Sequence, residues 1–275
     1  MSDFIDKCRE DIPLIMGVVN VTPDSFSDGG AYLAADKAIE HGKLLLKEGA
    51  DILDIGGEST RPNAETVSIE EEIERILPVI EGLAVHAPYI SIDTRNAATM
   101  QAAIQVGANI VNDVSGLTHD PDAADIVAQS GLPVCIMHMQ GNPKTMQNAP
   151  TYENVIDEIM AFFEERLEFC SRRNLGSKSI VLDPGIGFGK TLEYNLLIIK
   201  NINKFKVFNC PVLLGVSRKS FINSLCDEPN PAGRIFGSIS AALYGLENGV
   251  DIFRVHDVKE TKQAFTVHRA IASAL

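Results

Sequence analysis

Short apolar, β-branched runs alternate along the chain with longer segments that have helical periodicity. Eight such runs lead into polar or charged residues, and they span residues 14–20, 52–56, 89–93, 109–112, 134–138, 180–183, 212–217 and 252–256. Strands that alternate with helices predict a parallel sheet, and eight such units predict a closed barrel. We therefore expect an α/β protein, a (β/α)8 TIM barrel, with its chemistry at the C-terminal ends of the strands.

The segments between the runs carry signals for helix ends. Residues 68–71 form a predicted capping box, Asp120 before Pro121 predicts a helix N-cap, and Gly49 and Gly131 lie where helices are expected to end. The stretch 153–174 predicts a long amphipathic helix that packs on the barrel or on a partner chain.

Two connections differ from the others. Residues 21–33 and 57–67 have little helical character and are rich in Gly, Ser, Thr, Asp and Pro. Long connections of this kind inside a compact domain are typical of mobile active-site loops.

Length and composition fit one barrel domain. The chain has 275 residues, of which 45% are hydrophobic, and this is enough for one core. We expect a lead-in over residues 1–12 and a single catalytic domain over 13–275. The start is charged and no apolar run reaches membrane-spanning length, so a protein without a membrane anchor is expected. The five cysteines form no C-x-x-C pair, which favours a reducing cytoplasm.

The formal net charge of −13 excludes a nucleic-acid-binding surface, because such a surface needs clustered Lys and Arg. An anionic substrate therefore needs a local basic pocket. Arg254 and His256 point the same way at the end of the eighth run, and barrel closure places them beside Asn20 at the end of the first. Arg and His suit a phosphate or diphosphate, and the Asn oxygen suits Mg²⁺. A salt-bridged barrel rim is the alternative.

Acidic and amide groups end other runs. Asp93, Asn112 and Asp183 end the third, fourth and sixth runs, and Lys219 follows the seventh. A carboxylate accepts two parallel N–H donors from a heterocycle with a guanidine-like edge, such as a pterin. An internal ion-pair network is the structural alternative. Asp54, inside the second run, is either a carboxylate that holds a strand-end group or a satisfied core acid.

The glycine-rich segment 184–191 looks like a phosphate-binding loop but fits neither nucleotide motif. Pro184 occupies the first Gly place of a Walker A sequence, and Lys190 occupies the last Gly place of the dinucleotide fingerprint. We expect the glycines to let the loop backbone pass close to a flat ligand that Phe188 covers. His138 has no second His at metal-ligand spacing.

Five motifs in one order closely resemble those of the dihydropteroate synthase family. They are NVTPDSFSDGG (20–30), DIGGESTRP (54–62), DPGIGFGKT (183–191), GVSRKS (215–220) and RVHD (254–257). The resemblance runs from about Pro13 to the C-terminus. One departure is Asn63, where family members commonly have Gly.

The resemblance implies a folate-pathway transferase. It implies condensation of (7,8-dihydropterin-6-yl)methyl diphosphate with 4-aminobenzoate, giving 7,8-dihydropteroate and pyrophosphate, usually on a homodimer. Its mechanism is an SN1-type route in which the two long loops close before diphosphate leaves.

The resemblance also implies roles for particular residues. The pterin is held by Asp93, Asn112, Asp183 and Lys219, the diphosphate by Thr60, Arg254 and His256, and Mg²⁺ by Asn20. The aminobenzoate pocket is walled by Phe26, Pro62, Phe188 and Lys219, with Ser220 at the carboxylate. Asp93 is expected to stabilise the cation left by diphosphate, and Asp28 and Arg61 to order the closed loops.

Two rivals remain at this point. A pterin-binding methyltransferase on the same barrel shares the acidic pterin side but needs neither Mg²⁺ at Asn20 nor the Arg254 and His256 anion site. A non-catalytic pterin binder is expected to lack loop residues, and all those required are present in this chain.

Overall fold

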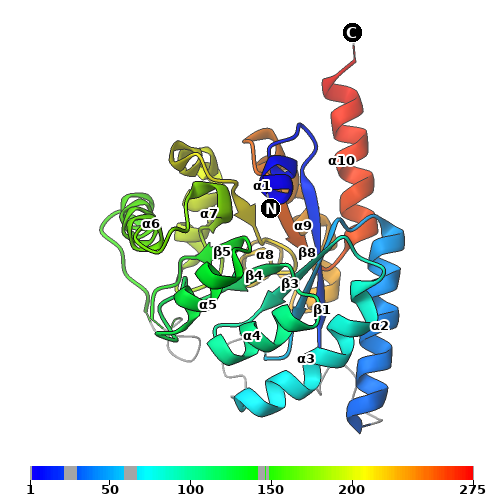
Figure 1. The fold of residues 1–275 in the computed structure, drawn as a ribbon. Coiled ribbons are helices and arrows are strands. Elements are labelled where there is room, and N and C mark those ends of the chain that lie inside the picture. The colour runs from blue at the N-terminus through cyan, green and yellow to red at the C-terminus, as the bar shows by residue number, and fades with distance from the viewer. Residues whose placement is uncertain (1, 22–29, 59–66, 142–145, 147–148, 275) are drawn as a thin grey trace.

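Eight parallel strands form one sheet in the computed structural model, ringed by helices (Figure 1). The structure describes residues 2–21, 30–58, 67–141, 146 and 149–274. The strands are β1 (Leu14–Asn20), β2 (Ile52–Gly56), β3 (Tyr89–Asp93), β4 (Ile110–Asp113), β5 (Val134–Met137), β6 (Ile180–Asp183), β7 (Leu213–Leu214) and β8 (Ile252–Val255). Their order is β6-β5-β4-β3-β2-β1-β8-β7, and a parallel bridge between Leu182 and Val212 brings β6 and β7 together. The predicted barrel is confirmed.

Helices connect successive strands and cover the outside of the barrel. They are α1 (Ser2–Cys8), α2 (Gly30–Glu48), α3 (Ile69–Ala84), α4 (Ala97–Gln105), α5 (Ala123–Ser130), α6 (Val155–Ser171), α7 (Leu192–Lys200), α8 (Ser220–Cys226), α9 (Ile235–Glu247) and α10 (Val258–Ala272). Short 3-10 turns span Ser177–Ser179, Ile202–Phe208 and Pro231–Arg234. Among the described residues, no helix is both long enough and apolar enough to cross a membrane.

The core has two parts because strand side chains alternate faces. The larger part lies between the sheet and the outer helices. The smaller part, here called the barrel-floor cluster, fills the inside of the barrel and consists of Phe4, Ile5, Cys8, Leu14, Met16, Ile52, Ile110, Cys135, Val181, Leu213 and Ile252. Helix α1, formed by the expected lead-in, thus closes the N-terminal end of the barrel, and its Phe4 ring packs edge-on against Tyr89 at 5.0 Å.

Several predicted boundaries shift. The fourth strand is one residue later than predicted, the fifth ends at Met137, the eighth ends at Val255, and the seventh shrinks to two residues. The seventh strand ends early because Arg218 turns into the left-handed region at φ 58°, its backbone N donates to Ser238 Oγ, and Ser217 Oγ accepts from His256 N. Helix α2 begins at Gly30, inside a stretch predicted to have little helical character. The rest of the two long connections, residues 22–29 and 59–66, lies outside the described residues.

The predicted helix signals are mostly correct. Ser68 caps α3 by accepting a hydrogen bond from Glu71 N, and Gly131 ends α5 at φ 65°. The predicted helix 153–174 is α6, and its apolar stripe packs on the barrel. Asp120 lies one turn earlier than predicted, because α5 begins after Asp122. Its Oδ1 accepts from Asp122 N at 3.0 Å, as a capping residue does, and its Oδ2 also accepts from Ala97 N at the start of α4.

Candidate active site

Polar side chains from five strands or their following loops meet in one cleft at the C-terminal end of the barrel. Inward positions recur every second residue. On β8, Ile252 lies in the barrel-floor cluster, whereas Arg254 and the following His256 reach the cleft. The lining residues are Asp93, Asn112, Val114, Met137, Asp183, Ile186, Phe188, Gly215, Ser217, Lys219, Arg254 and His256. The predicted convergence of strand ends is therefore present.

Arg254 is bound to two carboxylates. Its Nε donates to Asp54 Oδ2 at 2.6 Å, and its Nη2 donates to Asp93 Oδ2 at 2.7 Å. Burial acts to lower the pKa of Arg254, but the charges of Asp54 and Asp93 outweigh it and raise this pKa above its ordinary value. Burial raises the pKa of Asp93 to about 7, against the opposing effect of Arg254. The sequence predicted that Arg254 lies on an anion-binding side of the site, apart from the acidic residues. The structure differs, because the long side chain of Arg254 reaches Asp54 and Asp93.

Asp54 holds two of the residues that line the cleft. It is fully buried inside β2. Besides the bond from Arg254, its Oδ2 accepts from Asn112 Nδ2 at 3.2 Å. Of the two possibilities left open by the sequence, the structure favours the carboxylate that holds strand-end groups. A buried carboxylate of this kind fixes side-chain orientation without needing to touch a ligand.

Asp183, Lys219 and Phe188 form the opposite part of the cleft. Burial raises the pKa of Asp183, although Gly185 N donates to its Oδ1 at 2.7 Å and Lys219 lies nearby. Burial lowers the pKa of Lys219 to about 8, opposed by Asp183. The Lys219 Nζ lies 4.2 Å from the centroid of the Phe188 ring, a cation–π arrangement. Phe188, from the loop after β6, and Lys219, a predicted catalytic residue, are thus in direct contact.

His256 is held by the loop that follows β7. Its backbone N donates to Ser217 Oγ at 3.1 Å, and its Nδ1 lies at the same distance from that oxygen. Arg218, which follows Ser217, makes a two-point ion pair with Asp257, which follows His256. Its Nε lies 3.0 Å and its Nη2 2.5 Å from the carboxylate oxygens. Arg234 Nη1 donates to Arg218 O at 3.0 Å. These bonds fix the loop that carries Lys219 relative to the end of β8.

The remaining predicted site residues fall into two groups. Asn20 ends β1 half-buried, in register with Gly56 and, through it, with Asp93. Ser220 is exposed and begins α8, next to Lys219, but does not line the cleft. The other predicted residues lie outside the described residues: Phe26, Asp28, Thr60, Arg61 and Pro62.

Sequence reasoning missed part of the cleft wall. Met137 lies two residues after the inward-facing Cys135, so its orientation was available from strand alternation. Val114 and Ile186 lie in loops just beyond the strand ends, where no periodicity exists to reveal them. These three apolar side chains give the cleft a surface suited to a flat ring.

The arrangement suits a planar heterocycle that carries an anionic group. Asp93 and Asp183 can accept from a guanidine-like edge, and Asn112 can both donate and accept. Arg254 and His256 add donors for an anion. Apolar walls with a few convergent polar groups and shifted pKa values are typical of a small-molecule site.

The chain matches the family model described as "Pterin binding enzyme" over residues 16–256. It is 45% identical over 263 residues to the dihydropteroate synthase of Escherichia coli (strain K12), an alignment that covers 95% of this chain and 93% of that protein.

Solved structures show the same similarity. The dihydropteroate synthase of Xanthomonas albilineans with 4-aminobenzoic acid has a TM-score of 0.91 and 41% identity, covering 96% of this chain and 95% of that chain. The same species' enzyme in complex with 7,8-dihydropteroate has a TM-score of 0.87 and 39% identity, with the same coverage.

Proposed function

Because this chain belongs to the dihydropteroate synthase family, we propose that it condenses (7,8-dihydropterin-6-yl)methyl diphosphate with 4-aminobenzoate. The products are 7,8-dihydropteroate and pyrophosphate. The observation that carries the proposal is one cleft in which the buried carboxylate of Asp183, the 11% exposed carboxylate of Asp93, an amide, a lysine and an arginine converge. These are the groups needed to bind a pterin and to receive its diphosphate.

The pterin ring is proposed to lie between Met137, Val114 and Ile186, with its amidine edge on Asp183 and its other polar atoms on Asn112 and Lys219. Burial raises the pKa of Asp183, so a partner that donates two N–H groups stabilises its ionised form. Apolar contact on the ring faces supplies affinity, and the polar groups fix orientation.

Diphosphate is proposed to bind at Arg254, His256 and Thr60. Bonds to Asp54 and Asp93 use two of the five Arg254 N–H groups. Ser217 lies against Nδ1 of the His256 ring, so this contact orients the ring. Both side chains stabilise the charge that develops as diphosphate leaves.

Mg²⁺ is proposed as the cofactor, with Asn20 as its protein ligand. The described residues contain no group of three His, Cys, Asp or Glu that could hold a metal. A single carboxamide nevertheless fits, because Mg²⁺ keeps several waters and takes further oxygens from substrate phosphates. Asn20 lies in register with the strand end that carries Asp93, on the face where the diphosphate is expected. When bound, Mg²⁺ would neutralise part of the diphosphate charge.

The chemical step is proposed to be dissociative. Departure of diphosphate leaves a cationic pterin methylene, and ionised Asp93 would stabilise it electrostatically. The amine of 4-aminobenzoate then attacks this carbon, and the arylammonium that forms loses one proton to water. An arylamine is a weak base, so the step needs no strong general base. Asp28 and Arg61 are proposed to order the two long loops that exclude water.

The second substrate is proposed to lie against Phe188 and Lys219, with Ser220 at its carboxylate and with Phe26 and Pro62 completing the walls. Lys219 sits within 4.2 Å of the Phe188 ring centroid and near Asp183. It can therefore contact both substrates.

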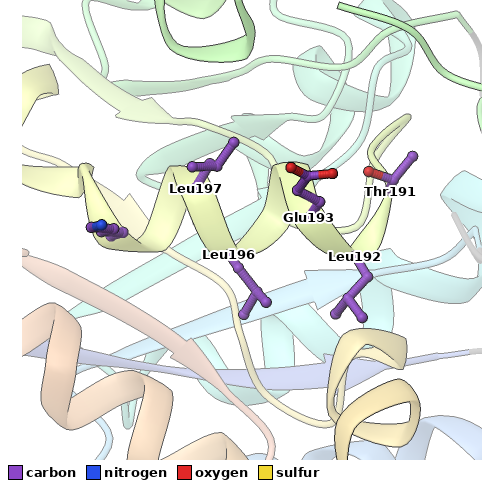
Figure 2. Close-up of a pocket in the computed structure, with 6 residues that line it drawn as sticks. Thr191, Leu192, Glu193, Leu196 and Leu197 are labelled. Carbon is purple, nitrogen blue, oxygen red and sulfur yellow. The ribbon is translucent and has the colours of Figure 1, made fainter.

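The working form is proposed to be a homodimer in the cytoplasm. An apolar groove runs along α7, where Leu192 and Leu196 point to the same side (Figure 2). Leu196 is 39% exposed, and Phe236 on the neighbouring α9 is 86% exposed. A surface of this kind fits a second copy of the chain. Sedimentation equilibrium of Leu196→Glu should show monomers; a wild-type monomer would overturn the proposal.

The cytoplasmic location is supported by the cysteines. Their free thiols, four of them buried, fit a reducing compartment.

The decisive experiment measures pyrophosphate release from the pterin diphosphate, with and without Mg²⁺ and 4-aminobenzoate. We expect Mg²⁺-dependent release, and 7,8-dihydropteroate when 4-aminobenzoate is present. Pterin binding without release would favour the non-catalytic binder. Methyl transfer from methyltetrahydrofolate would favour the methyltransferase.

A further inference from the structure

A buried lysine lies behind the Phe188 wall of the cleft and is not used by the proposed mechanism. Lys190 is only 2% exposed. Its Nζ donates to Phe188 O at 2.9 Å and to His138 O at 3.2 Å, and lies 3.1 Å from His138 Nδ1. An ammonium group has three donors, and these three acceptors match them.

None of these three partners is a carboxylate, which makes the lysine unusual. A buried ammonium is costly without a carboxylate bonded to it, and burial lowers the pKa of Lys190 to about 7 although the charge of nearby Asp183 acts to raise it. Burial and the nearby Lys190 lower the pKa of His138 to about 3, so His138 is neutral near pH 7 and its Nδ1 can accept a hydrogen bond. An apolar side chain would fill this space at lower cost, so the bonds themselves need a reason.

The bonds join two loops whose backbones touch. A Cβ added at Gly185 would lie 2.0 Å from His138 O, and one added at Gly189 would lie 2.5 Å from Gln140 O. Both glycines have positive φ, 71° and 65°. Gly185 and Gly189 therefore let the loop after β6 approach the loop after β5. Gly187 instead faces the cleft, where an added Cβ would lie 3.3 Å from Lys219 Cδ, and the approach of this loop to a flat ligand stays a prediction.

His138 is itself held from the other side. Its ring packs edge-on against Phe162 with centroids 5.0 Å apart. Lys190 thus ties the carbonyl of Phe188 to a residue fixed by α6. On the cleft side, the Phe188 ring contacts Lys219. A continuous chain of contacts runs from α6 through His138, Lys190 and Phe188 to Lys219.

We propose that Lys190 and His138 are positioning residues that hold Phe188 in place as the wall of the second-substrate pocket. The inference rests on the proposed role of Phe188 in binding 4-aminobenzoate. Lys190 acts on the Asp183 carboxylate through its charge, but its hydrogen bonds reach the backbone of Phe188 and not the pterin-binding carboxylates. The inference therefore assigns Lys190 a larger effect on the second substrate than on the pterin.

The test compares Lys190→Met with the wild type in steady-state kinetics and in pterin binding. Loss of a hydrogen bond from a charged donor changes a binding constant by roughly ten- to hundredfold. We expect KM for 4-aminobenzoate to rise about tenfold or more, while Kd for the pterin diphosphate changes less than about twofold. An unchanged KM in a folded variant, or an equal loss of pterin affinity, would overturn the proposal.

Tyr152→Phe is the matched control. Tyr152 Oη donates to Gly189 O at 2.8 Å, so this variant removes one hydrogen bond to the same loop without touching Phe188. Its KM for 4-aminobenzoate should stay within about twofold of the wild type. A rise equal to that of Lys190→Met would mean that general loop stiffness, and not the Lys190 contact, sets KM.

A double-mutant cycle with Phe188→Ala separates positioning from a general structural effect. If Lys190 acts through Phe188, Lys190→Met should change KM little in the Phe188→Ala background. Additive effects would overturn the inference. Phe188→Ala alone tests the proposed pocket, so an unchanged KM there would count against the proposed function instead. Should Lys190→Met fail to fold, His138→Gln in the same cycle gives the same two outcomes.

Discussion

Arg254 on β8 donates from Nη2 to Asp93 Oδ2 on β3 across 2.7 Å, and so joins two residues to which opposite tasks are assigned. Arg254 is proposed to hold the leaving diphosphate, and Asp93 to stabilise the cation it leaves behind. Their ion pair keeps both charges in one small space before substrate binds. The pair also balances the desolvation of each group, since a buried charge without a partner is costly.

Arg254→Ala tests the anion role of Arg254. We expect Kd for the pterin diphosphate to rise roughly ten- to hundredfold, because a charged hydrogen bond contributes about 1.5–3 kcal/mol. The pterin alcohol, which lacks diphosphate, should lose much less affinity. Isothermal titration calorimetry of both ligands measures the ratio. Equal losses would show that Arg254 serves mainly to hold Asp54 and Asp93.

Asp54→Asn tests the buried carboxylate that orients the cleft. Asp54 is fully buried and accepts from Arg254 Nε at 2.6 Å. Removing one partner of a buried pair typically costs about 3–5 kcal/mol, so urea unfolding should show a loss of this size. Glu40→Gln, which breaks the exposed pair with Lys43, is the control and should cost less than about 1 kcal/mol. Similar small losses for both variants would contradict the orienting role.

Much of the cleft was predictable because strand alternation is a local property. Once Ile252 is assigned to the inside of β8, Arg254 and the following His256 are expected to face the same way, and the structure places Ile252 in the barrel-floor cluster and the other two in the cleft above it. The same reasoning holds for Asp93 and Asp183. What failed depends on contacts between residues far apart in the sequence.

The end of β7 shows why those contacts were not predictable. Apolar residues continue to Val216, but the strand stops at Leu214, because Ser217 and Arg218 bond to His256 and Asp257, 39 residues further along. Asp120 is a similar case: its sequence context predicts its bond to Asp122 N at the start of α5, but not its second bond, from the first residue of α4. Partner choice over such separations has no local signal.

Ile5→Ala tests whether α1 contributes to the stability of the barrel. Ile5 is 2% exposed and belongs to the barrel-floor cluster. Truncating a buried Ile typically costs about 2–5 kcal/mol, which urea unfolding should detect. Ile12→Ala, at a 47% exposed position, should cost less than about 1 kcal/mol. A negligible loss for Ile5→Ala would mean that α1 is dispensable for the barrel.

The shifted pKa of Lys219 predicts a distinctive pH dependence of stability. In the folded protein burial lowers this pKa from 10.5 to about 8. Between these two values the unfolded chain binds more protons than the folded protein, so this group makes the free energy of unfolding rise as the pH increases. Below about pH 8 both states hold the proton, and the contribution of Lys219 no longer changes.

Lys219→Met removes this contribution while keeping a long side chain. We therefore expect the wild type to gain stability relative to Lys219→Met between pH 8 and pH 10, measured by urea unfolding at both values in the same salt. Other groups, including Lys190, occur in both proteins, so their contributions largely cancel in the difference. If the two pH curves are parallel, the folded protein does not favour neutral Lys219. A relative loss of stability would mean that nearby carboxylates such as Asp183 outweigh the effect of burial and hold Lys219 charged.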